Sequence, residues 1–353
     1  MSIYSLMKPL VHSLDPETAH GLAIRALKSG FVSGGESVED GLLQTSLWGL
    51  DFPNPLGIAA GFDKDAEVVR PLASLGFGFV EVGSITPEPQ PGNPKPRLFR
   101  LSEDAAVINR MGFNSRGRFF ARERLKALRA SGYGGLVGVN LGKNKTSEDA
   151  AADYRLGTEA LAPYADYLVI NVSSPNTPGL RALQGKEELE KLIGAVQSVL
   201  ATMEKAPALV LKVAPDLNGE DQNDVAEVAL ASKLGGLIVS NTTIARPESL
   251  RSAHAGETGG LSGAPLFEAS TQVLETFYRL TKGEVPLVGV GGVSSAEQAY
   301  TKIKKGASLV QLYSALVYGG PELVNDILRG LITLLRQDGF ASVQEAVGSD
   351  VRI

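Results

Sequence analysis

Two lysines stand where the chain should be buried or should meet a ligand, and they limit the chemistry that the protein can perform. Lys212 lies inside the apolar run ALVLKVAP, and Lys64 follows directly after the apolar run that ends in AAGFDKD. A buried ammonium group is costly unless it meets a negative charge, so Lys212 requires an anionic ligand or a carboxylate partner. Lysines in such places bind anions or form Schiff bases with carbonyl substrates.

Amide and hydroxyl side chains end several other apolar runs. Asn140 and Asn171 each close one run, and Ser, Asn and Thr at 240–242 close another. A buried amide needs several hydrogen-bond partners, so amides at equivalent positions indicate one polar ligand with donors and acceptors. The serines and Pro-Asn-Thr of segment 173–177 also suit a simple turn. They do not form a G-x-S-x-G nucleophile motif, and no His or Asp suggests a hydrolase triad.

Glycine-rich segments supply the remaining signal. GGLSG occupies 259–263, GVGG occupies 289–292, and Ser295 and Ser314 stand at possible helix starts. Backbone N–H groups at such positions bind phosphate. Ala59, Ala60 and Gly61 (59–61) allow a flat ring or a phosphate to approach the backbone. Amides around a flat cofactor fit flavin mononucleotide better than a sugar phosphate, and no metal-binding constellation is present.

The elements that must position these residues follow one recurring pattern: a short apolar run, a turn and a helical segment. Eight runs too short for buried helices occur at 56–60, 79–82, 136–140, 167–171, 209–213, 237–240, 287–290 and 309–312. Helical patterns occur at 66–74, 115–131, 146–161, 187–203, 218–233, 265–280, 295–305 and 321–337. The alternation predicts an α/β fold, a (β/α)8 TIM barrel. The count of eight, without a first-turn G-x-G-x-x-G, disfavours a doubly wound open sheet.

The links after the second and sixth predicted strands are the longest. In a barrel, long loops after strands lie on the catalytic face and serve substrate binding.

Residues 1–38 fall outside this pattern and are predicted to form an N-terminal helical segment ahead of a barrel domain at 39–353. PETAHGLAIRALKSG, at 16–30, has a broad apolar face, and an earlier short helix contains Ile3, Leu6, Met7 and Leu10. Such helices either cap the barrel or contact a membrane surface. The pattern alone leaves both interpretations open.

Composition excludes several classes of protein. The 353 residues include no cysteine and three histidines, so disulfides, zinc–thiolate sites and iron–sulfur clusters are not expected. The formal net charge of −5 and the lack of a basic run argue against nucleic-acid binding. No apolar run approaches the ~20 residues that span a bilayer, and the N-terminus is unlike a secretory signal. A reducing cytoplasm is the expected environment.

Long motifs identify a family. The chain resembles the class 2, quinone-dependent dihydroorotate dehydrogenases from PETAH at 16–20 to LYSALVY at 312–318. The motifs that carry the resemblance are NPLGIAAGFDKDAE, EVGSITPEPQPGNPKPRLFRL, NRMGFNS, NVSSPNTPGLR, SNTT, GGLSG and GVGGV. So many ordered matches make the resemblance far more specific than the strand periodicity.

The resemblance implies oxidation of (S)-dihydroorotate to orotate, the redox step of pyrimidine synthesis. It implies one FMN per subunit as hydride acceptor and a membrane quinone as final oxidant. Ser174 stands at the position of the family's base. The implied protein is monomeric and lies peripherally on the cytoplasmic side of the cell membrane, where the N-terminal extension forms a quinone tunnel.

The resemblance also assigns site residues. Cofactor-binding positions are Ala60, Gly61, Phe62, Asp63, Lys64, Ser84, Asn140, Asn171, Lys212, Ser240, Gly263, Gly292, Tyr313 and Ser314. Substrate-binding positions are Lys64, Asn109, Arg110, Met111, Gly112, Phe113, Asn171, Asn176, Asn241 and Thr242. His20, Arg100 and Tyr313 are expected near the quinone. No metal is expected.

Class 1 members use a cysteine base, which this chain lacks. Ser84 and Ser240 stand where relatives often have Thr or another small residue, which leaves cofactor and reaction unchanged. Three alternatives remain: an FMN barrel acting on a dihydropyrimidine or dihydrouridine, an aldolase with Lys212 as Schiff base, and a membrane-associated binding module. The motifs NRMGFN and NVSSPNTPGL argue against the first.

Overall fold

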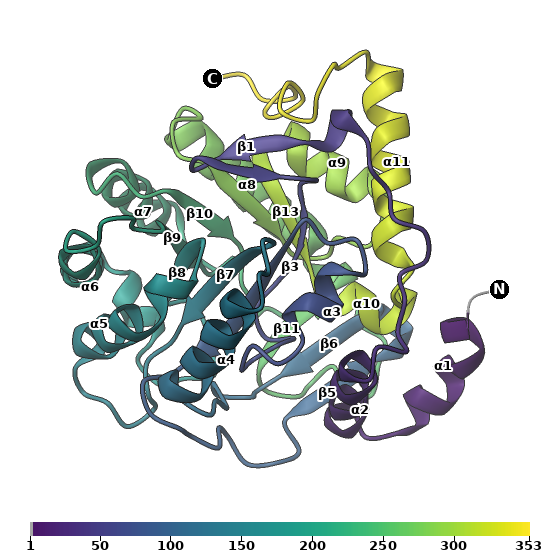
Figure 1. Ribbon diagram of the computed structural model, residues 1–353, viewed down its shortest axis with the longest axis horizontal. Helices are drawn as coiled ribbons and strands as arrows, with labels where there is room; N and C mark the ends of the chain where they lie inside the picture. Colours follow the sequence, from purple (N-terminus) through teal and green to yellow (C-terminus); the bar gives the residue numbers. More distant parts are fainter. Residues whose placement is uncertain (1–2) are drawn as a thin grey trace.

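Eight parallel strands close into a barrel in the computed structural model, which describes residues 3–353 (Figure 1). The barrel strands are β3 (Leu56–Ile58), β4 (Phe79–Ile85), β7 (Leu136–Leu141), β8 (Tyr167–Asn171), β9 (Ala208–Val213), β10 (Gly236–Val239), β12 (Leu287–Val290) and β13 (Ala307–Leu312). They follow this order around the ring, and β13 pairs with β3 to close it. The predicted (β/α)8 TIM barrel with an N-terminal helical extension is therefore confirmed.

Helices cover the outside of the ring. They are α3 (Val69–Ala73), α4 (Arg118–Ala130), α5 (Ala150–Leu161), α6 (Lys186–Leu200), α7 (Gly219–Ala231), α8 (Phe267–Leu280), α9 (Ala296–Lys304) and α11 (Leu323–Asp338). The short helix α10 (Ser314–Gly319) instead follows the end of β13 directly. Short 3-10 turns lie at Gly41–Leu43, Ser102–Asp104, Ala162–Tyr164, Arg181–Gln184 and Ala264–Leu266. Helix α10 was not predicted as an element separate from the strand that precedes it and the helix that follows it.

Helix α3 is shorter than the predicted 66–74 because the chain is held in a turn before it. The buried carboxylate of Asp63 accepts hydrogen bonds from Glu67 N at 2.8 Å and Val68 N at 2.7 Å. Ala66 has a φ of +58°, and a residue with this backbone conformation cannot be part of a right-handed α-helix. The helix therefore begins only at Val69.

The two long links form a small antiparallel sheet below the barrel as seen in Figure 1. Strands β5 (Leu98–Leu101) and β6 (Ala106–Asn109) come from the link after β4, and β11 (Gly260–Gly263) comes from the link after β10. Phe99 and Ile108 pair across β5 and β6, and Leu261 pairs with Ile108 from β11. Their buried side chains form a separate apolar cluster. The predicted insertions are therefore one structural unit.

The barrel interior is filled by aromatic side chains that occupy space above glycines on the neighbouring strand. A Cβ at Gly57 would lie 2.3 Å from the ring of Phe79, and a Cβ at Gly138 would lie 2.1 Å from that of Tyr167. Phe52, from the hairpin of β1 (Thr45–Leu47) and β2 (Leu50–Phe52), packs on Phe79 with ring centres 5.5 Å apart. These rings fill this layer of the barrel interior, and the large cavity described below lies at the opposite end.

The N-terminal helices α1 (Ile3–Ser13) and α2 (Pro16–Lys28) lie beside β5 and α10 (Figure 1). The guanidinium of Arg97 donates to Glu17 at 2.8 Å, and Arg100 donates to the carbonyl of His12 at 2.9 Å. The hydroxyl of Tyr4 donates to the carbonyl of Val317 at 2.6 Å. Between residues 3 and 353, no helix has the length and apolar character needed to cross a bilayer.

Replacing Gly138 by Ala is expected to destabilise the protein by about 1–3 kcal/mol, because the new methyl group must displace the Tyr167 ring. Urea unfolding measures the free-energy change. The matched control is Gly194→Ala at an exposed position of α6, where a Cβ meets nothing within 4 Å. That change is expected to stabilise by about 0.5–1 kcal/mol through helix propensity. Equal effects of the two substitutions would contradict this account of the interior.

Candidate active site

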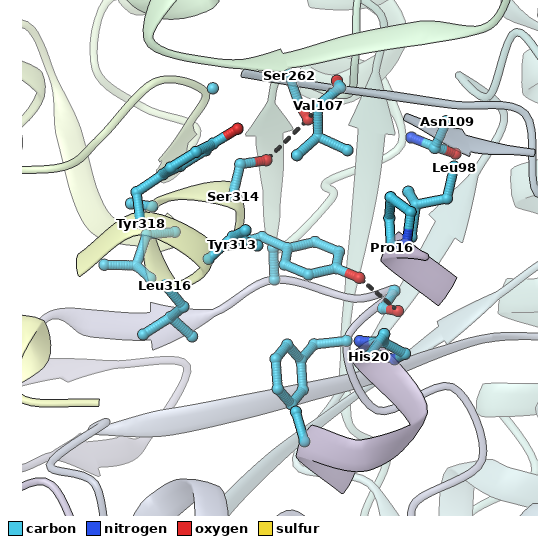
Figure 2. Close-up of a pocket in the computed structure, with 18 of the residues that line it drawn as sticks. Pro16, His20, Leu98, Val107, Asn109, Ser262, Tyr313, Ser314, Leu316 and Tyr318 are labelled. Atoms are coloured by element: carbon cyan, nitrogen blue, oxygen red, sulfur yellow. Dashed lines mark hydrogen bonds between the residues drawn. The ribbon is translucent and has the colours of Figure 1, made fainter. Parts of the chain in front are cut away.

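One cavity of about 1220 Å³ runs from the N-terminal helices to the carboxyl ends of the barrel strands. Figure 2 shows part of its lining, with His20 and Pro16 of α2 facing Tyr313. The predicted site residues that line it are Ala60, Gly61, Phe62, Lys64, Ser84, Asn109, Met111, Gly112, Phe113, Asn171, Ser174, Asn176, Lys212, Ser240, Asn241, Thr242, Gly263, Gly292, Tyr313, Ser314, His20 and Arg100. Residues from distant parts of the sequence therefore meet in one space.

Three predicted site residues do not line this cavity. The carboxylate of Asp63 is used in the turn before α3. Asn140 is fully buried beneath the cavity floor. Arg110 turns away to Glu257, which it meets at 2.7 Å, and its guanidinium stacks over the ring of Phe99 at 4.4 Å. Their side chains therefore support neighbouring residues instead of facing the cavity.

Below the cavity, the fully buried carboxylate of Glu81 on β4 joins five barrel strands. It accepts hydrogen bonds from Asn140 of β7 at 2.9 Å, Tyr167 of β8 at 3.2 Å and Gln311 of β13 at 2.6 Å. Lys212 Nζ of β9 lies 3.9 Å from Glu81 Oε1. Glu81 is therefore the carboxylate partner that Lys212 requires. We did not identify it from the sequence, although an acidic residue within the run FVEVGS was a visible signal.

The two cavity lysines have lowered pKa values. Burial lowers the pKa of Lys212, and the nearby charge of Glu81 acts in the opposite direction. Burial also lowers the pKa of Lys64 to about 8, against the attraction of Asp65 and Glu17. Lys64 Nζ donates to the carbonyl of Gly61 at 2.7 Å. Each ammonium group would be stabilised by an anionic ligand in the cavity.

The predicted amides form a chain of hydrogen bonds across three strand ends. Asn171 donates to Ser84 at 2.9 Å and to Asn140 at 3.0 Å. Asn241 donates in turn to Asn171 Oδ1 at 3.2 Å. Ser174 Oγ accepts a hydrogen bond from Asn176 N at 3.3 Å and faces the cavity. The amides are thus oriented by one another before any ligand binds.

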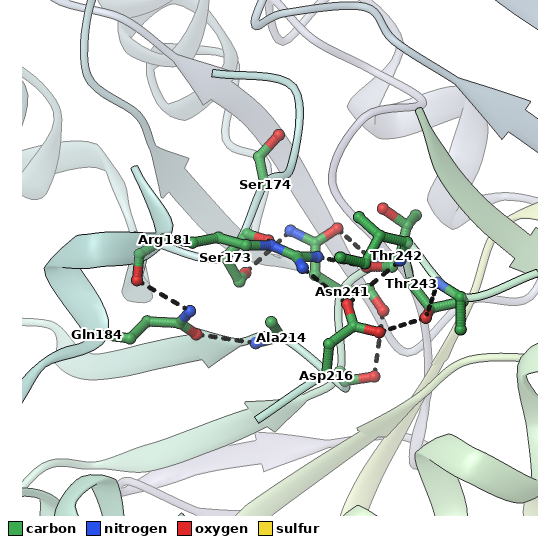
Figure 3. A network of polar contacts seen from close by, with 12 residues as sticks. Ser173, Ser174, Arg181, Gln184, Ala214, Asp216, Asn241, Thr242 and Thr243 are labelled. Carbon is green, nitrogen blue, oxygen red and sulfur yellow. Dashed lines mark hydrogen bonds and ion pairs between the residues drawn. The ribbon is translucent and has the colours of Figure 1, made fainter. Parts of the chain in front are cut away.

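Arg181 was not identified from the sequence, and it links the loops that carry these groups (Figure 3). Its guanidinium donates to the carbonyl of Ser173 at 3.0 Å and to that of Thr242 at 3.0 Å. It also forms an ion pair of 2.7 Å with Asp216, beyond the end of β9. Asp216 accepts a further hydrogen bond from the hydroxyl of Thr243. Arg181 therefore fixes the position of the carbonyl directly before Ser174.

At the other side of the cavity, glycines bring the backbone close to the open space. A Cβ at Gly292 would lie 2.6 Å from the backbone of Phe267, the first residue of α8, and Gly292 has a φ of +74°. Ser314 begins α10, and its Oγ lies 2.8 Å from that of Ser262, a residue that we did not predict (Figure 2). Ser295 instead caps α9 and does not line the cavity.

The end of the cavity near α2 is aromatic and apolar. The rings of His20 and Phe62 lie 5.2 Å apart, and those of Phe62 and Tyr313 lie 5.7 Å apart. The hydroxyl of Tyr313 donates to the carbonyl of Gly61 at 3.1 Å. Burial, together with the charge of Lys64, lowers the pKa of His20 to about 3. The imidazole is therefore neutral at physiological pH.

Fold and cavity together define a (β/α)8-barrel enzyme with an amide-lined pocket, buried lysines and a glycine-rich anion cradle. The family model described as dihydroorotate dehydrogenase matches residues 42–335. The chain is 57% identical to the dihydroorotate dehydrogenase (quinone) of Azorhizobium caulinodans, with 100% of both chains covered. It is 60% identical to that of Rhodospirillum rubrum, covering 99% of this chain and 95% of the relative.

Among solved structures, the crystal structure of dihydroorotate dehydrogenase from Eimeria tenella in complex with ferulenol superposes with a TM-score of 0.94. The two chains are 42% identical, and the match covers 98% of this chain and 99% of the other. This chain belongs to the dihydroorotate dehydrogenase family, and within it to the quinone-dependent class 2. It is therefore an oxidoreductase, which removes the aldolase and the binding module as alternatives.

Replacing Arg181 by Met is expected to lower dihydroorotate turnover about tenfold to hundredfold, because small displacements of reacting groups have effects of that size. Steady-state kinetics measures kcat and KM. Arg155→Met is the matched control, because Arg155 forms only an exposed ion pair with Glu159 on α5. Asp216→Asn should give a smaller loss of the same kind. A normal kcat in Arg181→Met would exclude the positioning role.

Proposed function

We propose that this protein oxidises (S)-dihydroorotate to orotate in pyrimidine biosynthesis, with FMN as hydride acceptor and a membrane quinone as final oxidant. The observation that carries the proposal is the single cavity, which holds lysines and amides at the strand ends and is mostly apolar near α1 and α2, apart from His20 and Arg100. A hydrophilic substrate and a lipophilic oxidant can then use one enclosed space. The names of the relatives support the same substrate and oxidant.

The cavity residues fit one FMN per chain. The glycines at 291 and 292 have positive φ values and leave no room for side chains, which suits a phosphate held against the backbone. Lys212, which is 5% exposed and lines the cavity, would offer a cation to the ring of a flat cofactor bound there. When bound, FMN supplies the hydride acceptor for carbon 6 of the substrate.

Ser174 is proposed to take the proton from carbon 5 of the substrate. A serine hydroxyl is a weak base at its ordinary pKa, so the reaction needs a site from which bulk water is excluded. Ser174 is buried, and so is the neighbouring Thr177. Lys64 is proposed to bind the substrate carboxylate, while Asn109, Asn171, Asn176 and Asn241 bind the pyrimidine ring. Amides supply both the donors and the acceptors that such a ring requires.

The N-terminal segment at 1–38 is proposed to be the quinone-access and membrane-contact region, and the remainder the catalytic domain. His20, Arg100 and Tyr313 are the proposed quinone-proximal residues. In this segment Leu6 is 63% exposed, Leu10 67% and Phe31 90%, and Leu10 and Phe31 also line the cavity. Exposed apolar side chains of this kind insert into the interfacial region of a bilayer. We propose a monomer bound peripherally at the cytoplasmic side of the cell membrane.

Purified protein is expected to be yellow, and its flavin bands should bleach when dihydroorotate is added under anaerobic conditions. Lys212→Met should slow this bleaching at least about tenfold, because the substitution removes a positive charge from the site of electron transfer. Visible absorption and stopped-flow spectroscopy provide the measurements. A yellow protein that does not bleach would indicate another ring substrate. A colourless protein that FMN cannot reconstitute would refute the proposal.

Substitution of Leu6 by Ser should reduce turnover with a long-chain quinone in vesicles several-fold and leave turnover with a short soluble quinone unchanged, because Leu6 is exposed and, unlike Leu10 and Phe31, does not line the cavity. Point changes are preferable to deletion, because Asn325 of α11 donates to Gly34 O at 2.6 Å and deletion would break that contact. Phe119→Ser provides a control at an exposed apolar residue on α4. An equal loss with both quinones would argue against membrane contact.

A further inference from the structure

Lys302 of α9 is a fully buried lysine that the proposed reaction does not use. Its stem runs beside Gly289 of β12, where a Cβ would lie 3.1 Å from Lys302 Cδ. The ammonium group donates to Ser270 Oγ at 2.9 Å and to Thr271 Oγ1 at 3.0 Å. It therefore ends in the first turns of α8, between that helix and the barrel.

Among residues 3–353, Lys302 has no anionic partner. Across residues 3–353, no carboxylate lies within ion-pair distance of Lys302, whereas Lys212 has Glu81. The negative charge of Glu268, an exposed residue, acts on Lys302 and favours its charged form. Burial lowers the pKa of Lys302 to about 7. The amino end of α8 adds further positive potential, so the region around the Lys302 ammonium group favours a nearby anion.

The contacts of Lys302 lead directly to the cavity wall. Ser270 Oγ lies 3.1 Å from the carbonyl oxygen of Gly291, to which it donates. Gly291 and Gly292 line the cavity, and Phe267 at the start of α8 packs against Gly292. The ammonium group also lies 5.3 Å from the centre of the Phe267 ring. One hydroxyl and one peptide thus separate the buried charge from the glycine cradle.

We propose that Lys302 is a positioning residue for the phosphate of bound FMN, acting from behind the cradle through its charge and through Ser270 and Gly291. The inference rests on the proposed function, because it requires a phosphate-bearing flavin in the cavity. Lys302 makes no direct contact with the ligand. A dianion in front of residues 291–292 supplies the negative charge that this lysine lacks, and water screens the interaction little in a buried setting.

The test is the preference of the protein for FMN over riboflavin, which lacks the phosphate. FMN-loaded holoenzyme is equilibrated with defined mixtures of the two flavins, desalted, and analysed for bound flavin by chromatography. Lys302→Met removes the charge at similar size. Lys304→Met, on the same helix, makes the same change in charge at a partly exposed residue whose ammonium group has carboxylates at 3.5 and 3.8 Å and lies over the Tyr300 ring at 4.9 Å.

In Lys302→Met, the preference for FMN should fall about tenfold or more, with the affinity for riboflavin within about twofold of the unmodified protein. Lys304→Met should leave the preference unchanged. A merely structural role would lower the affinity for FMN and for riboflavin equally. That result, or an unchanged preference for FMN, overturns the inference. If Lys302→Met does not fold, Lys302→Gln keeps a hydrogen-bond donor without the charge. The ratio of bound FMN to bound riboflavin in that variant then tests the inference. If the unmodified protein carries no flavin, the proposed function fails first.

Discussion

The structure depends on one buried carboxylate, that of Glu81 at the centre of the barrel. A carboxylate without exposure is tolerated only if its oxygens are paired, and β7, β8, β9 and β13 supply the partners. At the 3.9 Å separation of Glu81 and Lys212, attraction between unit charges is about 4 kcal/mol at an effective dielectric constant of ~20. The desolvation of the two ions costs a comparable amount. The pair therefore contributes little net stability, and its main effect is to fix the positions of the two side chains. It fixes Lys212 at the floor of the cavity.

Above this floor, the cavity has two parts with different linings, one polar and one mostly apolar. At the ends of β8 and β10, amides and hydroxyls orient one another. Arg181 connects the two loops that follow these strands by donating to the carbonyls of Ser173 and Thr242. On the α1 and α2 side, aromatic and aliphatic residues line the cavity, and His20 stays neutral because burial and Lys64 disfavour its charged form. A class 2 dihydroorotate dehydrogenase must serve a charged pyrimidine and a lipophilic quinone. The division of the cavity provides both environments within one fold.

Much of the candidate site was predictable because strand ends in a parallel barrel always meet at one face. Asn171, Ser174, Lys212 and Thr242 could therefore be assigned to one site from their positions after apolar runs and from the family motifs. The residues that we missed act through long-range contacts. Glu81 partners Lys212 across the barrel interior, Arg181 reaches Thr242 through space, and Ser262 meets Ser314 from a separate sheet. No local pattern encodes such pairings.

The sequence by itself determined the order of elements, the closed barrel, the family and most of the predicted site residues that line the cavity. Hydrophobic periodicity and local motifs suffice for these, because they reflect interactions between near neighbours in the chain. The tertiary structure alone decided which charges are paired and which side chains turn away. Arg110 leaves the cavity for Glu257, Asp63 is taken up by a turn, and Lys302 is buried without a carboxylate. The physical reason is that burial and electrostatic pairing depend on distances that exist only after the chain has folded.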